Sequence, residues 1–362
     1  MLALNPYKRS NMNSYKNWVV EAELSGTRLD VFLQKMAPER SRSEWSRIIE
    51  EGCILINSKA ITQRSYRLQA LDEVTFDRQQ KDIPTLDPKI LAGQITYTPP
   101  DILFEDESLM VINKPEGLPV HSGHGIPFEK TLAHWLLHKK YLSKDESWPE
   151  EVVADERWGI VHRLDQGTSG AMVVAKNANV HRKLSEAFQN RLVHRRYFAI
   201  ATGSPLTLSK KIPPLLDKWC RDEKAAFRMN GNRFSLATQY GRDPTHPLRM
   251  SPLPEGGKRA ITHGHIHSEA PPHSLIELKL QTGRTHQIRS HLRFLGFSIV
   301  GDELYGGQKW RRILLHSHMM RFTHPITQKE IQLSANSPSF LEACLQLGIN
   351  IPTETDNLWT DI

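Results

Sequence analysis

Apolar residues recur at intervals of three and four in two stretches near the start of the chain, which is the spacing of one buried face of an α-helix. The first stretch comprises Leu29, Phe32, Leu33 and Met36, and the second comprises Trp45, Ile48 and Ile49. Thr27 and Ser43 precede the two stretches and are the expected N-caps. The pattern therefore predicts two short amphipathic helices.

Two strands are predicted after these helices. The apolar run at residues 53–56 ends at Asn57, a turn former, and Val74 and Phe76 have the alternation of a closing strand. Together the helices and strands outline a compact module over residues 18–78. A polar stretch with prolines at 84, 88, 99 and 100 follows, and residues 79–100 are predicted to form a linker.

From residue 101 to residue 350 the chain alternates strand-like and helix-like segments, which predicts a second and larger domain of the α+β class. Residues 1–17 are polar and residues 351–362 are acidic, and both are expected to be disordered tails. The first segment lacks the apolar centre of a secretory signal. No apolar run reaches the length of a membrane span. We expect a cytoplasmic protein without a membrane partner.

The composition adds two constraints. Hydrophobic residues make up 39% of the chain, and the formal net charge of +7 permits binding to nucleic-acid phosphates without requiring it. The cysteines are Cys53, Cys220 and Cys344. This sparse and odd set predicts neither a disulfide framework nor a paired-cysteine metal site.

Residues 159–176 concentrate polar side chains between two apolar stretches. Ile160 and Val161 predict an incoming strand, and residues 171–175 predict an outgoing one. The polar side chains between them are His162, Arg163, Asp165, Gln166, Thr168 and Ser169. Protein scaffolds tend to hold catalytic groups in such positions. On chemistry alone Asp165 could cap a turn, pair with an arginine, or act as a nucleophile or base.

The letters HRLDQGTSG at residues 162–170 closely resemble the signature of the RluA-type RNA pseudouridine synthases. Four further blocks resemble the same family in the family's order, at residues 103–121, 195–203, 278–307 and 314–327. The resemblance implies an α+β catalytic domain with a mixed, mainly antiparallel sheet and a central cleft. It also implies an enzyme that isomerises uridine to pseudouridine in structured RNA, either ribosomal or transfer RNA.

The resemblance assigns roles to individual residues. Asp165 matches the catalytic aspartate, Tyr197 the tyrosine that packs against the flipped uracil, and Arg284 the basic residue that pairs with the aspartate. Arg163 matches an arginine that fills the gap left by the extruded base, and Ile288 matches an apolar residue of the base pocket. The neighbouring residues left without a role, as either phosphate contacts or supports of the turn, are His286, Gln287, Arg289 and His291.

The implied reaction is an isomerisation, so the resemblance implies no metal, nucleotide or redox cofactor. The chain agrees, because it contains neither a P-loop nor a Gly-x-Gly-x-x-Gly fingerprint. Asp165 would either attack the anomeric carbon of the sugar or remove its 2′ proton. We expect the enzyme to act as a monomer.

Residues 25–61 resemble the αL RNA-binding module named for a small-subunit ribosomal protein, through TRLD, then SRS, then a G-x-I-x-I-N strand. The resemblance implies that a set of basic residues contacts RNA phosphates, namely Arg40, Arg42, Arg47 and Lys59. The alternative is a solvated helix face, since acidic residues are interspersed at 39, 44, 50 and 51. With the pattern match we favour RNA binding.

Two segments depart from the family pattern. Residues 230–255 resemble an insertion and are expected to form a tolerated surface loop, or else a contact with a particular RNA. His263, His265 and His267 alternate along a predicted strand, with His273 nearby, and could bind zinc. We favour no metal, because no cysteine or acidic ligand accompanies them at a recognised spacing. The rival functions are a catalytically silent RNA-binding protein and a metal-dependent hydrolase built on this strand.

Overall fold

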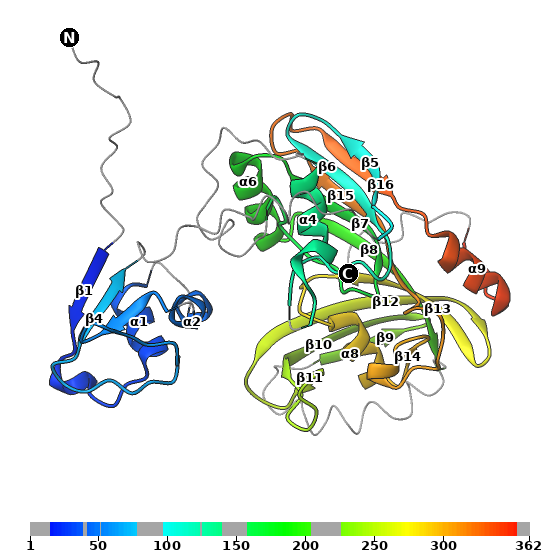
Figure 1. Cartoon of the computed structure of the whole chain (residues 1–362). Helices are drawn as coiled ribbons and strands as arrows, with labels where there is room; N and C mark the ends of the chain where they lie inside the picture. The colour runs from blue at the N-terminus through cyan, green and yellow to red at the C-terminus, as the bar shows by residue number, and fades with distance from the viewer. Residues whose placement is uncertain are drawn as a thin grey trace, which may run out of the picture. The chain divides into compact units, whose positions relative to one another are not determined.

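The structure is a computed structural model that describes residues 15–38, 42–50, 52–77, 97–123, 125–139, 158–203 and 226–352. Arg40, most of both predicted tails and most of the predicted linker lie outside these ranges. The chain divides into two compact units, Met1–Pro88 and Lys89–Ile362, and each is described by itself (Figure 1). The division falls inside the segment that is predicted to be a linker.

The N-terminal unit is a four-stranded antiparallel sheet that shares one core with two helices. Its strand order is β1-β4-β2-β3. Its elements are β1 (Tyr15–Val19), the 3-10 turn η1 (Ala22–Leu24), α1 (Leu29–Met36), α2 (Arg42–Glu50), β2 (Ile54–Ile56), β3 (Lys59–Ala60) and β4 (Glu73–Asp77). The predicted helices and strands are confirmed. Residues 15–17, which are predicted to be tail, instead form part of β1.

Trp45 is the centre of this unit's core. Its side chain is fully buried, and its indole N–H donates to the carbonyl of Ala37 at 3.1 Å. Its ring makes edge-to-face contacts with Trp18 and Phe76, at 6.3 and 5.4 Å between ring centroids. One side chain therefore joins α2 to the end of α1 and to strands β1 and β4.

The predicted caps of both helices are wrong. Arg28, and not Thr27, is the N-cap residue of α1, and its side chain makes no capping hydrogen bond. The N–H groups at residues 29 and 30 donate instead to the carbonyls at residues 66 and 64, at 2.8 and 3.4 Å. A neighbouring loop thus satisfies the donors that a cap would otherwise satisfy. α2 begins at Arg42, which places Ser43 inside the helix.

The larger unit is built on a twelve-stranded sheet with the main order β11-β10-β12-β13-β8-β15-β7-β6-β5, to which β9, β14 and β16 are added. Among the described residues, every strand pair is antiparallel except β15 with β7. This arrangement confirms the predicted mixed, mainly antiparallel sheet. The strands are β5 (Asp101–Glu105), β6 (Leu109–Lys114), β7 (Ser169–Ala175), β8 (His194–Thr202), β9 (Ala226–Asn230), β10 (Arg233–Arg242), β11 (Met250–Leu253), β12 (Lys258–Ala270), β13 (His273–Leu280), β14 (Ser298–Ile299), β15 (Leu315–Thr323) and β16 (Glu330–Ser334).

Helices cover both faces of this sheet. They are α4 (Leu132–His138), α6 (Ala178–Gln189), α8 (Gln287–Phe294) and α9 (Pro338–Gln346), with the 3-10 turns η3 (Phe128–Lys130) and η4 (Glu303–Tyr305). Figure 1 shows α4 and α6 beside the end of the sheet that carries β6 and β7, and α8 beside β10 and β14. None of these described helices has the length and hydropathy needed to cross a membrane.

Alternate residues of the central strand β8 belong to different cores. Tyr197 and Ala199 lie in the cluster that contains Ile288 of α8, whereas Phe198 and Ile200 lie in the cluster that contains Phe340 of α9. This alternation is the period of two expected of a strand buried on both faces. The face that carries Tyr197 is the one on which the candidate site is built.

The prediction of a surface loop at residues 230–255 is wrong. β10 runs through the segment and pairs with β9, β11 and β12. Phe234, Leu236 and Tyr240 on this strand are each at most 2% exposed. These apolar residues alternate with polar ones, which is the period of a strand. The prolines and arginines of the flanking turns made this pattern look like a loop.

Gly170 marks a close approach of two backbones in the sheet. It lies opposite Ser317 in the parallel pair of β7 and β15, with a φ of +119°. A Cβ at this position would lie 2.2 Å from the carbonyl oxygen of Ser317 and 2.7 Å from its nitrogen. Only glycine allows the two backbones to approach so closely.

We expect Gly170→Ala to lower the free energy of unfolding by about 3 kcal/mol or more, since the clash is with backbone and the φ is strained as well. Urea denaturation followed by circular dichroism would measure this loss. Gly123→Ala is the matched control, because Gly123 has open space around it and no positive φ. Equal midpoints for the two variants would contradict the close approach.

Candidate active site

The loop that carries Asp165 is anchored by buried structure on one side. Ile160 makes a single bridge to Val174 and no strand, so the predicted incoming strand is wrong. The predicted outgoing strand is confirmed as β7, which is buried along its whole length. The N–H of Thr168 donates to the carbonyl of Asp165 at 3.0 Å and closes a tight turn. Asp165 is thus held at a turn next to the centre of the sheet.

The carboxylate of Asp165 is partly exposed, with 18% of its side chain accessible. Its Oδ2 accepts a hydrogen bond from Nη1 of Arg289 at 3.2 Å. The preceding residue, Leu164, is buried in the cluster that contains Tyr197 and Ile288. Asp165 therefore stands at the edge of an apolar core, bound to one cation and still accessible to solvent.

A second carboxylate immobilises Arg289. Its Nε and Nη2 donate to the two oxygens of Asp302 at 2.7 and 2.8 Å, and the side chain of Asp302 is 1% exposed. The guanidinium also lies over the ring of Tyr305, 5.0 Å from its centroid. Burial disfavours the charge, but the hydrogen bonds and attraction of Asp302, followed by the attraction of Asp165, raise the pKa of Arg289. It is therefore a fixed positive charge directed at Asp165.

The predicted pairing of Arg284 with Asp165 is wrong. Arg284 is exposed in the turn before α8, and its Nε donates to the carbonyl of Arg259 at 3.3 Å. Arg289 lies within α8 and is the arginine that reaches Asp165. Both arginines belong to the same block, TGRTHQIR. The choice between them depends on where the helix starts and on the buried partner Asp302, which the block does not reveal.

The predicted base-pocket residues lie in one apolar cluster. Tyr197 on β8 and Ile288 on α8 are 3% and 4% exposed, and both share this cluster with Leu164. Arg163 is exposed on the loop between Leu164 and His162. This grouping is compatible with the predicted pocket, and the roles of the three side chains stay predictions.

Lys114 supports the loop from the end of β6. Its side chain is fully buried, and its Nζ donates to the carbonyls of Pro115, Leu118 and Gln166 at 2.8, 2.9 and 3.3 Å. Burial, followed by repulsion from Arg312, lowers the pKa of Lys114 to about 7. Because Gln166 directly follows Asp165, this lysine fixes the backbone of the loop that carries Asp165.

Arg312 fixes the other end of the loop. Its Nη2 donates to Oγ of Ser169, the first residue of β7, at 2.7 Å, and its Nη1 donates to Oε2 of Glu116 at 2.8 Å. The same Oγ is hydrogen-bonded to Nδ1 of His316 at 2.8 Å. Burial disfavours the charge on Glu116, but the attraction of Arg312 lowers the pKa of that carboxyl. An ionic network that is buried at Arg312 and partly exposed at Glu116 therefore holds the start of β7, next to the loop.

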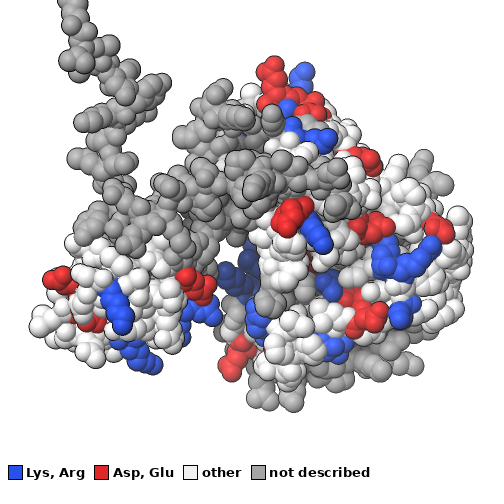
Figure 2. Space-filling view, in the orientation of Figure 1, with Lys and Arg blue, Asp and Glu red and all other residues white. Residues whose placement is uncertain are grey.

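The predicted RNA-binding residues of the N-terminal unit are placed only in part. Lys59 is exposed on β3, and Arg42 and Arg47 belong to α2. Arg40 lies outside the described residues. On the face shown in Figure 2, basic and acidic side chains are interspersed, so net charge alone marks no binding surface there.

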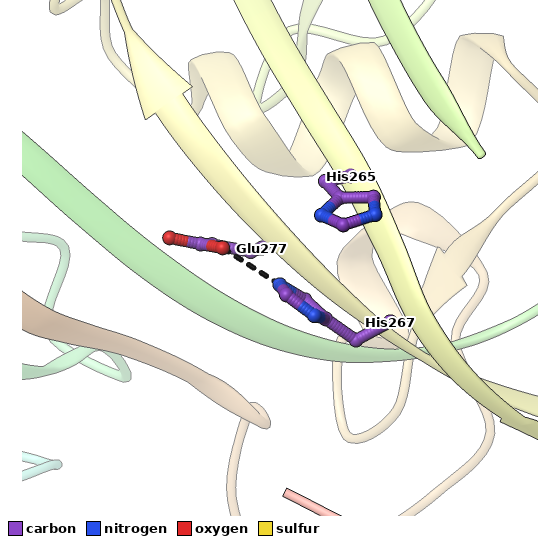
Figure 3. A group of neighbouring side chains, drawn as sticks. All are labelled: His265, His267 and Glu277. Carbon is purple, nitrogen blue, oxygen red and sulfur yellow. Dashed lines mark hydrogen bonds and ion pairs between the residues drawn. The ribbon is translucent and has the colours of Figure 1, made fainter. Parts of the chain in front are cut away.

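The predicted histidine strand is confirmed as β12, and it meets an acidic residue that the sequence pattern does not show. The ligand atoms of His265, His267 and Glu277 lie within 4.8 Å of one another (Figure 3). Glu277 comes from β13, directly opposite His265. Its carboxylate is already engaged, by Nε2 of His267 at 2.6 Å and by Arg196 at 3.5 Å. The positive charge of Arg196 opposes a cation at this group.

The histidine group lies on the other face of the sheet from Asp165. Glu277 pairs across the sheet with Phe198, which belongs to the α9 core, whereas Tyr197 belongs to the α8 core. Directly opposed residues share a face. A metal held by this group would therefore be separated by the sheet from the loop that carries Asp165. This arrangement gives no support to a hydrolase that uses both groups.

Both units match known proteins. Residues 108–294 match the family described as RNA pseudouridylate synthase, and residues 27–74 match the S4 domain. The chain is 32% identical over 340 residues to ribosomal large subunit pseudouridine synthase D of Xylella fastidiosa, covering 88% of this chain and 87% of that one. It is 31% identical over 361 residues to the protein of the same name from Neisseria meningitidis serogroup B, covering 94% and 85%.

Among solved structures, the chain resembles the human protein called RNA pseudouridylate synthase domain containing 4. The TM-score is 0.47 and the sequence identity is 24%, over 70% of this chain and 94% of that one.

We expect Arg289→Met to lower the free energy of unfolding by about 3–5 kcal/mol, because it leaves the carboxylate of Asp302 buried without its cation. Arg284→Met is the matched control within the same block and should change stability by less than about 0.5 kcal/mol, since Arg284 is exposed. Denaturant unfolding of the two variants measures both values. A decrease that is the same for both would contradict the different environments of the two arginines.

Proposed function

The chain belongs to the RluA-type RNA pseudouridine synthases and carries an N-terminal S4 RNA-binding domain, and we propose that Asp165 is its catalytic carboxylate. The protein is an isomerase that acts on RNA. The observation that carries the proposal is the hydrogen bond between the accessible Asp165 and the immobilised Arg289. A neighbouring cation favours the ionised carboxylate that a nucleophile or base requires.

The target base must reach this carboxylate. A uridine in folded RNA has to leave its stack before an enzyme can act on its glycosidic bond. Tyr197 supplies an aromatic ring for the flipped uracil, an interaction worth about 1–3 kcal/mol per base. Ile288 supplies an apolar wall in the same cluster. Arg163, exposed on the catalytic loop, occupies the space that the base leaves in the RNA.

Asp165 acts on the sugar of the flipped uridine by one of two routes. It attacks the anomeric carbon and displaces the uracil, or it removes the 2′ proton as the uracil leaves. In both routes the freed uracil rotates, and its carbon 5 forms the new bond to the anomeric carbon. Carbon 5 then loses its proton and the released nitrogen N1 gains one, and the carboxylate or the 2′ position returns to its starting state. Product and substrate contain the same atoms, so no further reactant is needed.

We propose large-subunit ribosomal RNA as the substrate. Relatives from two bacteria, which align with most of this chain, are called ribosomal large subunit pseudouridine synthase D, and the S4 domain adds a second RNA-binding unit. Transfer RNA is the alternative structured substrate. We further propose a monomeric enzyme of the cytoplasm; one chain supplies every residue of the proposed site, which is compatible with a monomer.

We expect Asp165→Asn to reduce pseudouridine formation in large-subunit ribosomal RNA by about a thousandfold or more, because an amide is neither nucleophile nor base. Chemical mapping of pseudouridine in RNA from cells that lack this protein, after treatment with each variant, measures the reduction. The melting temperature and RNA affinity should stay close to wild type, because the amide keeps the shape of the side chain. Asp101→Asn, at an exposed position on β5, is the matched control.

Turnover by Asp165→Asn at the wild-type rate would overturn the assignment of this carboxylate. A wild-type protein that binds the RNA but modifies nothing would instead support the catalytically silent alternative. Sites that appear only in transfer RNA would leave the mechanism standing and replace the proposed substrate.

We expect removal of residues 1–78 to weaken RNA binding while leaving activity at high RNA concentration, because every proposed catalytic residue lies in the second unit. The slope of log affinity against log salt should become shallower by about 0.9 for each RNA phosphate that the shortened protein no longer neutralises. Lys59→Gln in the full chain tests one such phosphate, since Lys59 is exposed on β3. Identical affinities and slopes for all three proteins would show that the basic residues of this unit are only solvated.

A further inference from the structure

A cavity of about 300 Å³ lies in the larger unit where α6, β8 and the turn after β13 meet. Its walls include Phe188, Arg191, Arg195, Thr282, Gly283 and Arg284. The turn at residues 281–284 leads directly into α8, the helix that carries Arg289. The cavity therefore borders the element that anchors the proposed catalytic carboxylate.

Arg195 is a buried cation in the wall of this cavity. It is 9% exposed, and its Nε has no hydrogen-bond acceptor. Among the described residues, no carboxylate lies within ion-pair distance of it, in contrast to Arg289 and Arg312. Its guanidinium lies 5.3 Å from the centroid of the Phe188 ring, a contact that orients the group without supplying a counter-charge. A buried and unpaired charge is unfavourable, so an anion in the cavity would be stabilised.

The surroundings of Arg195 leave room for such an anion. Gly283 has no side chain beside the guanidinium; a Cβ there would lie at van der Waals distance, 3.4 Å, from both Nη atoms of Arg195. Arg191 and Arg284 are exposed and also line the cavity. Guanidinium groups match the oxygens of a phosphate, which accepts several N–H hydrogen bonds at once.

We propose that this cavity binds a backbone phosphate of the RNA strand that carries the target uridine, a step that rests on the proposed function. Arg195 binds the phosphate from the inner wall, and Arg191 and Arg284 bind it from the exposed side. Arg284 thus contributes to substrate binding and not to the pairing with Asp165. The phosphate supplies the counter-charge that Arg195 lacks within the described residues.

The cavity is mechanically connected to the catalytic loop. His162, the first residue of the HRLD sequence, stacks on Phe188 at 4.5 Å between ring centroids. Its Nε2 accepts the N–H of Val173 on β7 at 3.0 Å. One aromatic block therefore joins the cavity wall, the loop and the central sheet. The packing of these rings keeps Arg195 and Asp165 in a fixed position relative to each other. A phosphate held by Arg195 therefore positions the RNA strand relative to Asp165.

The test is Arg195→Met, which keeps the apolar contact with Phe188 and removes the charge. We expect RNA affinity to fall by about tenfold or more, since the variant cannot donate a hydrogen bond to a charged group. The salt slope of RNA binding should become shallower by about 0.9. The melting temperature without RNA should stay the same or rise, because an uncompensated buried charge has been removed. Arg182→Met, at an exposed arginine of α6 that is paired with Glu186, is the matched control and should leave all three quantities unchanged.

A purely structural role for Arg195 predicts the reverse pattern. The melting temperature would then fall, and the RNA affinity and salt slope of the folded variant would equal those of wild type. That result would overturn the proposal. Arg195→Lys is a second test, because it keeps the charge and should restore most of the salt slope. Its single ammonium lacks the fork of N–H donors of a guanidinium and should restore less of the affinity.

Inorganic phosphate distinguishes an RNA phosphate from a free anion. If the cavity serves the RNA, millimolar phosphate should raise the melting temperature of wild type, but not of Arg195→Met, and should compete with RNA. Stabilisation by phosphate without competition would mean a site for a free anion and would overturn the RNA assignment. Pseudouridine formation by wild type is recorded on the same RNA. Its absence, with the Arg195 effects intact, would overturn the proposed function and leave the cavity as an RNA-phosphate site.

Discussion

One guanidinium group connects the loop that carries Asp165 to the rest of the larger unit. Arg289 donates two hydrogen bonds to the buried Asp302, thirteen residues later, and a third to Asp165, 124 residues earlier. The bidentate pair fixes α8 to the start of η4, where Asp302 is the N-cap, and this gives the remaining N–H of Arg289 a defined direction. Because desolvated charges are stable only when they are paired, the arrangement holds together as a unit. The proposed catalytic carboxylate therefore takes its position from an ion pair that contacts no substrate.

Two further cations, Lys114 and Arg312, hold the loop that carries Asp165 through hydrogen bonds to its backbone and to the start of β7. Lys114 donates to three backbone carbonyls, and Arg312 joins Glu116 to Ser169 at the start of β7. Gly170 then brings β7 into close contact with β15. These contacts limit the motion of the loop before RNA binds. A reacting group that is already oriented needs little rearrangement in the transition state, which is the benefit of preorganisation.

The buried arginines of this unit differ in one respect that has functional meaning. Arg289 and Arg312 have carboxylate partners, and both belong to the support of the loop. Arg195 is comparably buried, lines a cavity and has no such partner among the described residues. The protein itself supplies the counter-charge of Arg289 and Arg312, whereas the proposed counter-charge of Arg195 is a bound RNA phosphate. The same physical rule, that a buried charge requires a counter-charge, accounts for both the rigid site and the proposed phosphate contact.

Periodicity and motifs in the sequence determined much of this protein. The three- and four-residue spacing around Phe32 and Ile48 predicted α1 and α2, and the apolar run at residues 171–175 predicted β7. The HRLD block indicated the family and the loop that holds Asp165. These features are local, and a local pattern suffices to specify them.

Only the tertiary structure decided which groups pair with each other in hydrogen bonds, ion pairs and strands. The block TGRTHQIR offers two arginines, and only the buried Asp302 shows that Arg289 is the one fixed beside Asp165. The start of α1 is satisfied by backbone carbonyls of a distant loop and not by Thr27, and β10 became recognisable as a strand once β9, β11 and β12 were seen beside it. Hydrogen bonds and ion pairs between residues far apart in the chain depend on which groups folding brings within about 3 Å of each other, and no local pattern records that.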